Sequence, residues 1–191
     1  MADNLTLNAD GGGTVHKNSR FPRLLLTGPP QCGKTTVVRR VVERFPGRAA
    51  GFYTREVRQG GRRVGFEIVT LEGEAAWLSH VDFPGPLRVG KYGVDLTGLH
   101  RIGLAAMEPA PGISLIVVDE VGKMECLSGR FVEAMERLWT APAPLLVTVA
   151  AKGGGYIAQK KNKPEAQLIT VTPANRDALP DRILAILAGM G

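Results

Sequence analysis

Eight residues near the start of the chain have the types and spacing to bind phosphate. The segment 28–35 reads GPPQCGKT and fits the pattern G-x-x-x-x-G-K-[ST], the phosphate-binding P-loop. Gly28 and Gly33 would allow a tight turn that aims several backbone N–H groups at one anion. Lys34 would bring a mobile cation to the β- and γ-phosphates, and the Thr35 hydroxyl would bind Mg²⁺. The segment therefore predicts a site for a nucleoside triphosphate and Mg²⁺.

Two carboxylates at the end of an apolar run could complete this site. The run 115–118 reads LIVV and is followed by Asp119 and Glu120. In P-loop enzymes we expect such a strand beside the strand that precedes the loop, so Asp119 would hold Mg²⁺ through a coordinated water. Glu120 would project toward the γ-phosphate and orient or deprotonate an attacking water. The alternative is that both carboxylates cap the strand and face solvent.

Lys123 could add a further positive charge to the reacting phosphate. It lies three residues past Glu120 and could contact the γ-phosphate in cis, which is the role of an arginine finger. The alternative is a surface ion pair with Glu125, which would have no part in catalysis. The residues predicted to act in catalysis are Lys34, Glu120 and Lys123, and those predicted to bind the metal are Thr35 and Asp119.

A polar segment near the C-terminus could contact the nucleobase. Arg176 could stack its planar cation on a base, with Asn175 beside it. Part of the pattern has a structural explanation, with Thr172 as an N-cap and Pro173 as the first helical residue. The predicted nucleotide-binding residues are Gly28, Pro29, Pro30, Gln31, Cys32, Gly33, Lys34, Thr35, Thr36, Asn175 and Arg176.

The P-loop needs a strand before it and a helix after it, and the sequence has both patterns. The run 24–27 is short and apolar, as in a buried strand, and 34–45 has apolar residues at helical spacing. Alternating strand and helix patterns follow, which favours a mostly parallel sheet with helices on both faces. The other predicted strands are 49–57, 64–71, 114–118, 144–149 and 167–171, and the other predicted helices are 95–107, 128–139 and 175–187.

These elements predict a three-layer α/β fold with a β-hairpin insertion formed by the two strands within 49–71. The helix at 128–139 would turn Phe131, Met135 and Leu138 inward. We expect residues 1–20, which are polar and Gly-rich, to form a flexible tail. Residues 21–191 would then form a single domain with a substantial core.

Composition and charge limit the classes of partner. The net charge is +6, and a basic surface suits nucleotide phosphates as well as nucleic acid. Because no dense Lys/Arg block with interleaved aromatics is present, nucleoside triphosphates are favoured over nucleic acid. No membrane span or signal peptide is visible. The two cysteines, Cys32 and Cys126, lie in separate motifs, so we expect no structural disulfide and a cytoplasmic location. The oligomeric state stays open, with a monomer favoured.

Four sequence blocks, taken in order, resemble a known family. The acidic segment 119–125, DEVGKME, looks like the signature of the THEP1-type, or cancer-related, nucleoside-triphosphatases. The resemblance implies a compact P-loop NTPase fold, RecA-like or kinase-like, and Mg²⁺-dependent hydrolysis of several nucleoside triphosphates with loose base preference. The other blocks are GFYTREVR at 51–58 continuing to 65–66, VGKY at 89–92 with VDL at 94–96, and the segment 171–180.

Some positions depart from that family's pattern. Gln31 and Cys32 replace smaller residues within the loop, although the backbone N–H groups there are unaffected. The stretch 160–163 has lysines where arginines are typical, and lysine cannot make a bidentate phosphate contact. Two alternative functions stay open. One is a small-molecule or nucleotide kinase that uses 152–163 as a lid, and the other is a nucleic-acid-associated ATPase.

Overall fold

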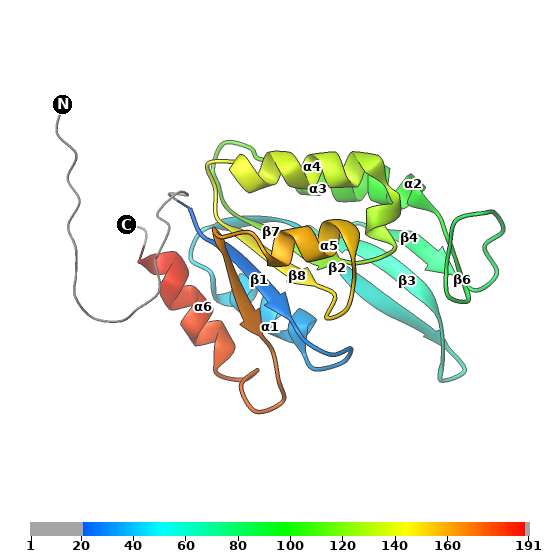
Figure 1. Cartoon of the computed structure of the whole chain (residues 1–191), viewed down its shortest axis with the longest axis horizontal. Coiled ribbons are helices and arrows are strands. Elements are labelled where there is room, and N and C mark those ends of the chain that lie inside the picture. The colour runs from blue at the N-terminus through cyan, green and yellow to red at the C-terminus, as the bar shows by residue number, and fades with distance from the viewer. Residues whose placement is uncertain (1–20, 190–191) are drawn as a thin grey trace.

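The computed structural model describes residues 21–189, and the strands among them form one nine-stranded sheet (Figure 1). The predicted tail at 1–20 lies outside the described residues. The strands are β1 Arg23–Thr27, β2 Arg48–Gln59, β3 Arg62–Thr70, β4 Ala75–His80, β5 Arg88–Val89, β6 Tyr92–Val94, β7 Ile113–Val121, β8 Leu145–Val149 and β9 Ala166–Thr170. The longer helices are α1 Lys34–Arg44, α4 Gly129–Thr140, α5 Gly155–Lys161 and α6 Leu179–Ala188.

The sheet has a parallel half and an antiparallel half, in the order β5-β6-β4-β3-β2-β7-β8-β1-β9. Strands β2, β7, β8, β1 and β9 pair in parallel, and β3 to β6 extend the sheet by antiparallel pairing. The predicted hairpin is continuous with this sheet, because the first half of β2 pairs with β7 and its second half with β3. The sheet therefore places the carboxyl ends of its parallel strands along one edge, where α/β proteins build their sites.

One feature of the strand order differs from the sequence-based expectation. Strand β8 lies between β7 and β1, so the strand that carries Asp119 is not adjacent to the strand before the P-loop. Register explains why the two still share a site, because Val118 on β7 is opposite Val147 on β8, and Thr148 is opposite Leu26 on β1. The inserted strand brings Thr148 between the two motifs.

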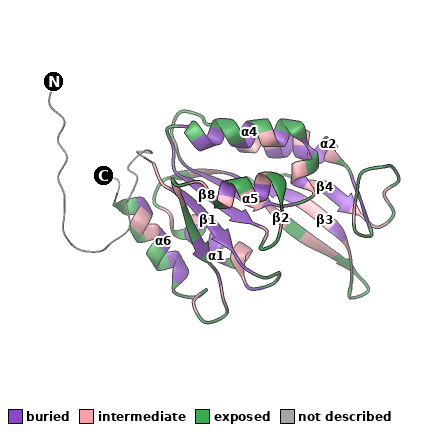
Figure 2. Ribbon diagram, viewed as in Figure 1, coloured by how far each residue is buried: buried purple, intermediate pink, exposed green. Residues whose placement is uncertain are grey.

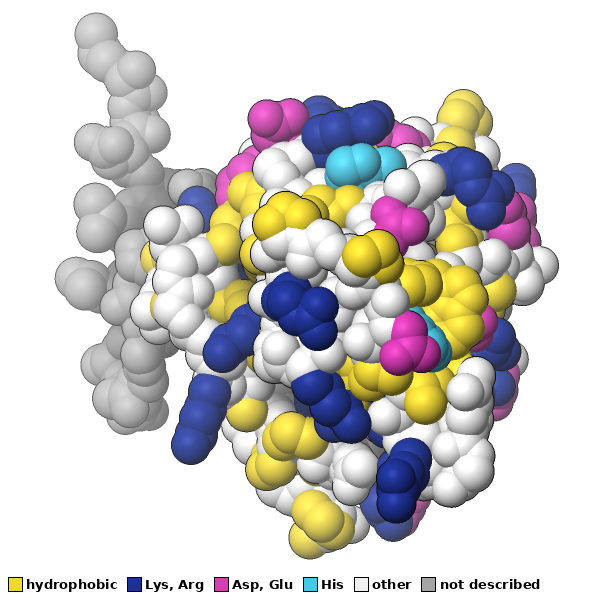
Figure 3. Space-filling view, turned by 90° about the vertical axis from the view of Figure 1, so that its right-hand side faces the viewer, with side chains coloured by type: hydrophobic (Ala, Val, Ile, Leu, Met, Phe, Trp, Pro, Cys, Tyr) yellow, Lys and Arg dark blue, Asp and Glu magenta, His cyan; other side chains and the backbone are white. Residues whose placement is uncertain are grey.

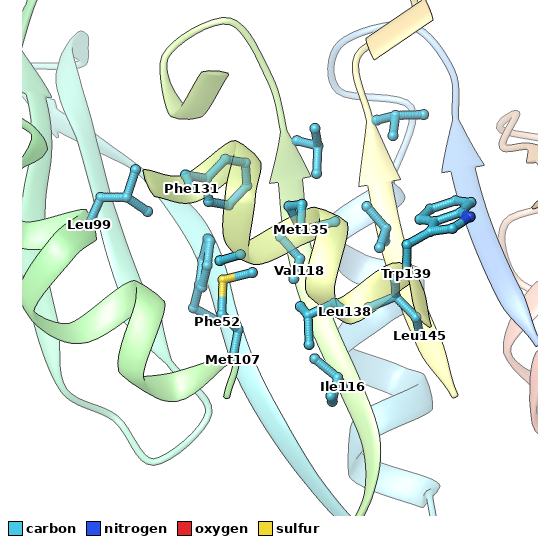
Figure 4. Packing of buried hydrophobic residues seen from close by; sticks show 14 of the residues in the cluster. Phe52, Leu99, Met107, Ile116, Val118, Phe131, Met135, Leu138, Trp139 and Leu145 are labelled. Carbon is cyan, nitrogen blue, oxygen red and sulfur yellow. The ribbon is translucent and has the colours of Figure 1, made fainter. Parts of the chain in front are cut away.

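Helices cover both faces of the sheet and create two cores. Helices α1 and α6 lie on one face, and α4 and α5 lie on the other (Figure 1). The strands between them are largely buried (Figure 2). Ser128 caps α4 by accepting a hydrogen bond from Phe131 N. As predicted, Phe131, Met135 and Leu138 are buried, and they pack against the sheet (Figure 4).

Two predicted helices differ in their details. The helix expected at 95–107 is a short α-helix, a π-helical turn and a second α-helical turn within Leu96–Ala106. The last helix begins at Leu179, four residues later than predicted. The Thr172 hydroxyl accepts from Asn175 N as a cap would, but a turn follows it and not the helix, and the proline in the first turn of α6 is Pro180, not Pro173. Within residues 21–189 no helix is long and apolar enough to cross a membrane.

Candidate active site

The P-loop connects β1 to α1, and its two glycines are required by close approaches. A Cβ on Gly28 would lie 2.6 Å from the Val171 carbonyl oxygen, and Gly33 has a φ of +107°. A Cβ on Gly33 would also lie 3.0 Å from Cδ of Arg176. Gly33 is the N-cap of α1 and has no side chain that could accept a hydrogen bond from the first N–H groups of the helix. The positive end of an eleven-residue helix therefore faces the loop, which suits an anion.

Lys34 and Glu120, predicted separately, lie side by side at this edge of the sheet. The Lys34 ammonium donates a hydrogen bond of 3.3 Å to the Gly28 carbonyl, and lies 3.6 Å from a Glu120 carboxylate oxygen. The Lys34 side chain is 10% exposed and that of Glu120 is 34% exposed. The lysine is thus held over the loop, while the carboxylate stays accessible to water. This arrangement contradicts the alternative of a Glu120 that only faces solvent.

Asp119 is buried, so the alternative of a solvent-facing cap is wrong for it as well. Its Oδ1 accepts a hydrogen bond from the Thr148 hydroxyl, and its Oδ2 is buried with no hydrogen-bond partner among the described residues. Burial raises the pKa of Asp119 to about 6, although the Thr148 and Thr35 hydroxyls oppose the rise. The Thr54 hydroxyl donates to the Asp119 carbonyl at 3.0 Å and fixes the end of β7.

The residues present fit a divalent cation of the kind the P-loop implies. Oxygen donors are the ligands that Mg²⁺ prefers, and it is held by few protein groups alongside substrate phosphates. Thr35 in the first turn of α1 and Asp119 near the end of β7 supply a hydroxyl and a carboxylate, and the Thr35 hydroxyl acts to lower the Asp119 pKa. A bound cation would also give the unpartnered Oδ2 of Asp119 a partner.

Thr148 was not among the sequence-predicted site residues. Its side chain is fully buried, and it occupies the fourth position of the β8 strand, which otherwise reads as apolar. A hydroxyl in such a strand needs a buried partner, and Asp119 is that partner. A single polar residue in an apolar run was the available signal. The position of the strand between β7 and β1 could not be read from the run itself.

The segment after Glu120 corrects one alternative for Lys123. Glu125 is only 4% exposed, and it accepts a hydrogen bond of 3.1 Å from Gly122 N, so the surface ion pair between Lys123 and Glu125 is wrong. Lys123 instead lines a cavity together with Arg88. A Cβ on Gly122 would lie 3.1 Å from a Glu120 carboxylate oxygen. The Glu120 carboxylate therefore rests on the same segment that carries Lys123.

Glu125 is a buried acid that the sequence did not single out. Burial raises its pKa to about 8, and the carboxylates of Glu120 and Asp119 contribute to the rise, against the hydrogen bond from Gly122 N. At neutral pH Glu125 is therefore mostly protonated. The sequence pattern alone suggests that Glu125 lies at the surface. Its burial depends on how the chain folds back after β7.

Replacing this acid should change how stability depends on pH. In the folded protein Glu125 keeps its proton up to about pH 8, whereas in the unfolded chain it ionises at the ordinary glutamate value. The folded state thus binds more protons between these values, so its stability falls as pH rises. We expect Glu125→Gln to remove about 1–3 kcal/mol of that fall between pH 5.5 and pH 8.

Urea unfolding of wild type and Glu125→Gln at several pH values checks this result. Glu133→Gln, on the exposed face of α4, is the matched control and should follow the wild-type curve. A stability difference between wild type and Glu125→Gln that does not change with pH would contradict the assignment.

Arg176 and Asn175 are the two residues near the C-terminus that were predicted to contact the nucleobase. Arg176 lies beside the P-loop, whereas Asn175 stabilises the turn that it forms with Thr172. The Arg176 side chain packs next to Gly33, as the 3.0 Å approach to its Cδ shows, and the residue is exposed. Asn175 accepts a hydrogen bond from Thr172 N at 2.8 Å and donates one to the Thr170 carbonyl at 2.9 Å. Both polar atoms of the Asn175 amide are thus engaged locally. Base contact by either residue stays a prediction.

The remaining predicted loop residues surround the site. Cys32 is buried and Thr36 is exposed on the first turn of α1. Pro29, Pro30 and Gln31 form the exposed outer part of the loop, where Cys32 N donates to the Pro29 carbonyl at 3.3 Å. Both cysteines are free, as predicted.

The segment 152–163, considered as a lid, has one lysine that is already occupied. Lys160 on α5 forms an ion pair with Glu136 at 2.7 Å, and its ammonium lies 4.7 Å from the centre of the Trp139 ring. Its side chain is 3% exposed. In this arrangement Lys160 fastens α5 to α4 and does not reach the P-loop. A lid that uses this lysine on a phosphate would have to break the ion pair.

Comparisons with known proteins agree with this geometry and with the resemblance in the sequence. A family model described as NTPase matches residues 23–184. The nucleoside-triphosphatase THEP1 of Thermotoga maritima is 39% identical over 166 residues, which cover 86% of this chain and 95% of that protein. The human cancer-related nucleoside-triphosphatase is 36% identical over 181 residues, with 85% and 95% covered.

A solved structure extends the agreement to the P-loop NTPase fold. The crystal structure of THEP1 from the hyperthermophile Aquifex aeolicus superposes with a TM-score of 0.79 at 33% identity, and the match covers 86% of this chain and 98% of that one. The chain therefore belongs to the THEP1-type family of nucleoside-triphosphatases.

Proposed function

We propose that this protein hydrolyses the γ-phosphate of nucleoside triphosphates in a Mg²⁺-dependent reaction that accepts several bases. The observation that carries the proposal is the placement of Lys34 over the P-loop, 3.6 Å from the Glu120 carboxylate, with buried Asp119 preceding Glu120 in the chain. The relatives named nucleoside-triphosphatase support hydrolysis itself.

The proposed roles follow from charge and exposure. The Lys34 ammonium would leave its ion pair with Glu120 to bind the β- and γ-phosphates, which frees the carboxylate to accept a proton from water. Glu120 is exposed enough to be reached by that water. A bound Mg²⁺, held by Thr35 and Asp119, would supply neutralisation of phosphate charge. Lys123 is the candidate for the finger-like cation.

The position of the Glu120 carboxylate also favours hydrolysis over phosphate transfer by a kinase. A kinase positions its base beside an acceptor hydroxyl, whereas here the carboxylate is directly beside the P-loop lysine. We propose a cytoplasmic location, which the two free thiols support. Nucleic acid is the less favoured partner, and its involvement would appear as stimulation of turnover that falls steeply with salt.

Base selectivity is expected to be modest. The P-loop binds phosphates, which all nucleotides share. Arg176 beside it is exposed and could stack on any base. ATP, GTP, CTP and UTP should therefore turn over within about tenfold of one another, or ~1.4 kcal/mol in transition-state binding.

Phosphate release measured with each nucleotide and Mg²⁺ alone tests both the reaction and its breadth. Release without any added acceptor supports hydrolysis, and no release until an acceptor is added would favour the kinase. A preference of roughly a thousandfold for one base, about 4 kcal/mol, would mean that a dedicated base pocket exists, and Arg176 would be the first residue to replace.

A further inference from the structure

A cavity next to the site is lined by residues to which the proposed reaction gives no role, with the exception of Lys123, the candidate for the finger-like cation. Its volume is about 450 Å³, within the range of small-molecule pockets. It lies between the β5–β6 turn, the segment after β7 and the start of α5. The lining residues that matter here are Arg88, Lys123, Leu127, Gly154, Tyr156 and Ile157.

The cavity borders the proposed catalytic carboxylate. Lys123 on its wall is three residues past Glu120, and the backbone at Gly122 lies against the Glu120 carboxylate, since a Cβ there would be 3.1 Å from Oε1. The short segment 122–127 is therefore both the support of Glu120 and a wall of the cavity.

The charge of the lining is positive and not compensated locally. Arg88 and Lys123 both line the cavity, none of the residues lining it is acidic, and neither cation has an ion-pair partner within the described part of the chain. The Arg88 guanidinium donates to two neutral groups, the carbonyls of Lys91 at 2.8 Å and Phe83 at 3.4 Å. These bonds orient the guanidinium but leave its charge free to attract an anion.

The rest of the lining is apolar or neutral. Leu127 and Ile157 contribute aliphatic surface and Tyr156 contributes a ring. Burial raises the pKa of the Cys126 thiol to about 12, so this lining residue is uncharged at neutral pH. Figure 3 shows one face of the molecule, on which Lys and Arg side chains occur at several places. The net charge of +6 would attract anions toward the molecule.

We propose that this cavity binds a second small molecule, an organic anion with a phosphate or carboxylate group and an apolar body. The anionic group would interact with Arg88 and Lys123, and the apolar body would pack on Leu127, Tyr156 and Ile157. This binding goes beyond nucleotide hydrolysis and does not require it. It would place a second ligand beside the nucleotide, separated from Glu120 by one segment of chain.

Gly154 offers a sharp test because it lines the cavity and a side chain there would meet no clash. Its φ is −93°, and a Cβ at this position would meet no atom within 4 Å. Gly154→Glu adds a carboxylate to the cavity, and Gly154→Gln is the matched control of equal size without charge. Arg88→Gln removes one of the two cations from the lining and needs no change at Gly154.

The probes are phenyl phosphate, phenylacetate and the neutral benzyl alcohol, each titrated without nucleotide and followed by backbone amide NMR shifts. We expect both anions to shift the amides of Gly153, Gly154 and Cys126. Gly154→Glu should bind them at least about tenfold more weakly than Gly154→Gln, since like charges placed together are strongly unfavourable. Arg88→Gln should weaken both anions several-fold, and benzyl alcohol should bind at least about tenfold more weakly than the anions.

A phosphate probe could also bind at the P-loop, and Lys34→Ala separates the two places. Binding at the cavity should persist in Lys34→Ala, whereas a probe at the P-loop would be lost there. Equal affinities of Gly154→Glu and Gly154→Gln would overturn the proposal, as would loss of all binding in Lys34→Ala, or the lack of cavity shifts at ~10 mM anion. Failure of hydrolysis with intact probe binding would reject the proposed function and leave this site standing.

Discussion

Lys34→Ala should lower kcat/KM for nucleoside triphosphates by at least about 100-fold, or ~2.7 kcal/mol of transition-state binding. The ammonium is held over the loop by the Gly28 carbonyl and lies 3.6 Å from Glu120. It is therefore placed to interact with a phosphate bound in the loop. Its loss leaves the developing phosphate charge without that partner, and leaves the two neighbouring carboxylates without a counterion. Nucleotide affinity should fall as well.

Steady-state phosphate release and nucleotide titration on the same samples provide the measurement. Arg62→Ala, which removes an exposed cation at the hairpin turn, is the control and should turn over like wild type. A folded Lys34→Ala protein with near-normal kcat/KM would refute the P-loop assignment. Circular dichroism and unfolding midpoints of both variants show whether a loss of turnover is instead a loss of folding.

Local sequence patterns predicted the parts of this site whose residues lie close together in the sequence. The P-loop specifies its own turn and its own helix, so Gly28, Gly33 and Lys34 lie as expected. Asp119 and Glu120 follow from an apolar strand that ends in carboxylates. Each of these inferences needs only a strand or helix and the residue next to it.

Features that depend on long-range packing were missed. Nothing in the sequence placed β8 between β7 and β1, since strand adjacency is set by how crossover connections pack, and so Thr148 went unrecognised as the partner of Asp119. Glu125 and Lys160 have charged side chains that usually face solvent. Their burial depends on tertiary contacts, the fold-back after β7 in one case and the packing of α5 on α4 in the other.

The start of the last helix shows how a local signal can mislead. Thr172 followed by Pro173 is a good helix start by type. In the structure the Thr172 hydroxyl does accept from Asn175 N at 3.3 Å, and the Asn175 amide accepts from Thr172 N and donates to the Thr170 carbonyl, but these bonds close a turn and not a helix. Asparagine side chains commonly close turns in this way. The helix begins only at Leu179, where Pro180 fits its first turn.

Glu120→Gln should separate nucleotide binding from the chemical step. The carboxamide keeps the size of the side chain and can accept a hydrogen bond, but it cannot take a proton from water. Lys34, Thr35 and Asp119 are unchanged, so nucleotide and Mg²⁺ should bind nearly as in wild type. The hydrolytic step should slow by about 10²–10⁴-fold, the usual contribution of a positioned general base.

Asp119→Asn is the comparison that gives this result its meaning. Asp119 is buried and has one carboxylate oxygen without a partner, which fits a metal ligand, so its replacement should raise the Mg²⁺ concentration needed for activity as well as lower the rate. Glu120 is partly exposed and paired with Lys34, so Glu120→Gln should leave the Mg²⁺ requirement near that of wild type. The two variants would then differ in the kind of defect and not only in the size of the defect.

Single-turnover rates and nucleotide affinities, measured across a Mg²⁺ series on both variants, decide between the roles. The proposal requires a slow rate with unchanged affinity and Mg²⁺ dependence for Glu120→Gln, and a shifted Mg²⁺ dependence for Asp119→Asn. If Glu120→Gln hydrolyses at the wild-type rate, another group must position the water, and the ion pair with Lys34 is only structural. The kinase alternative would then gain support, because a kinase needs its base beside the acceptor and not at the end of β7.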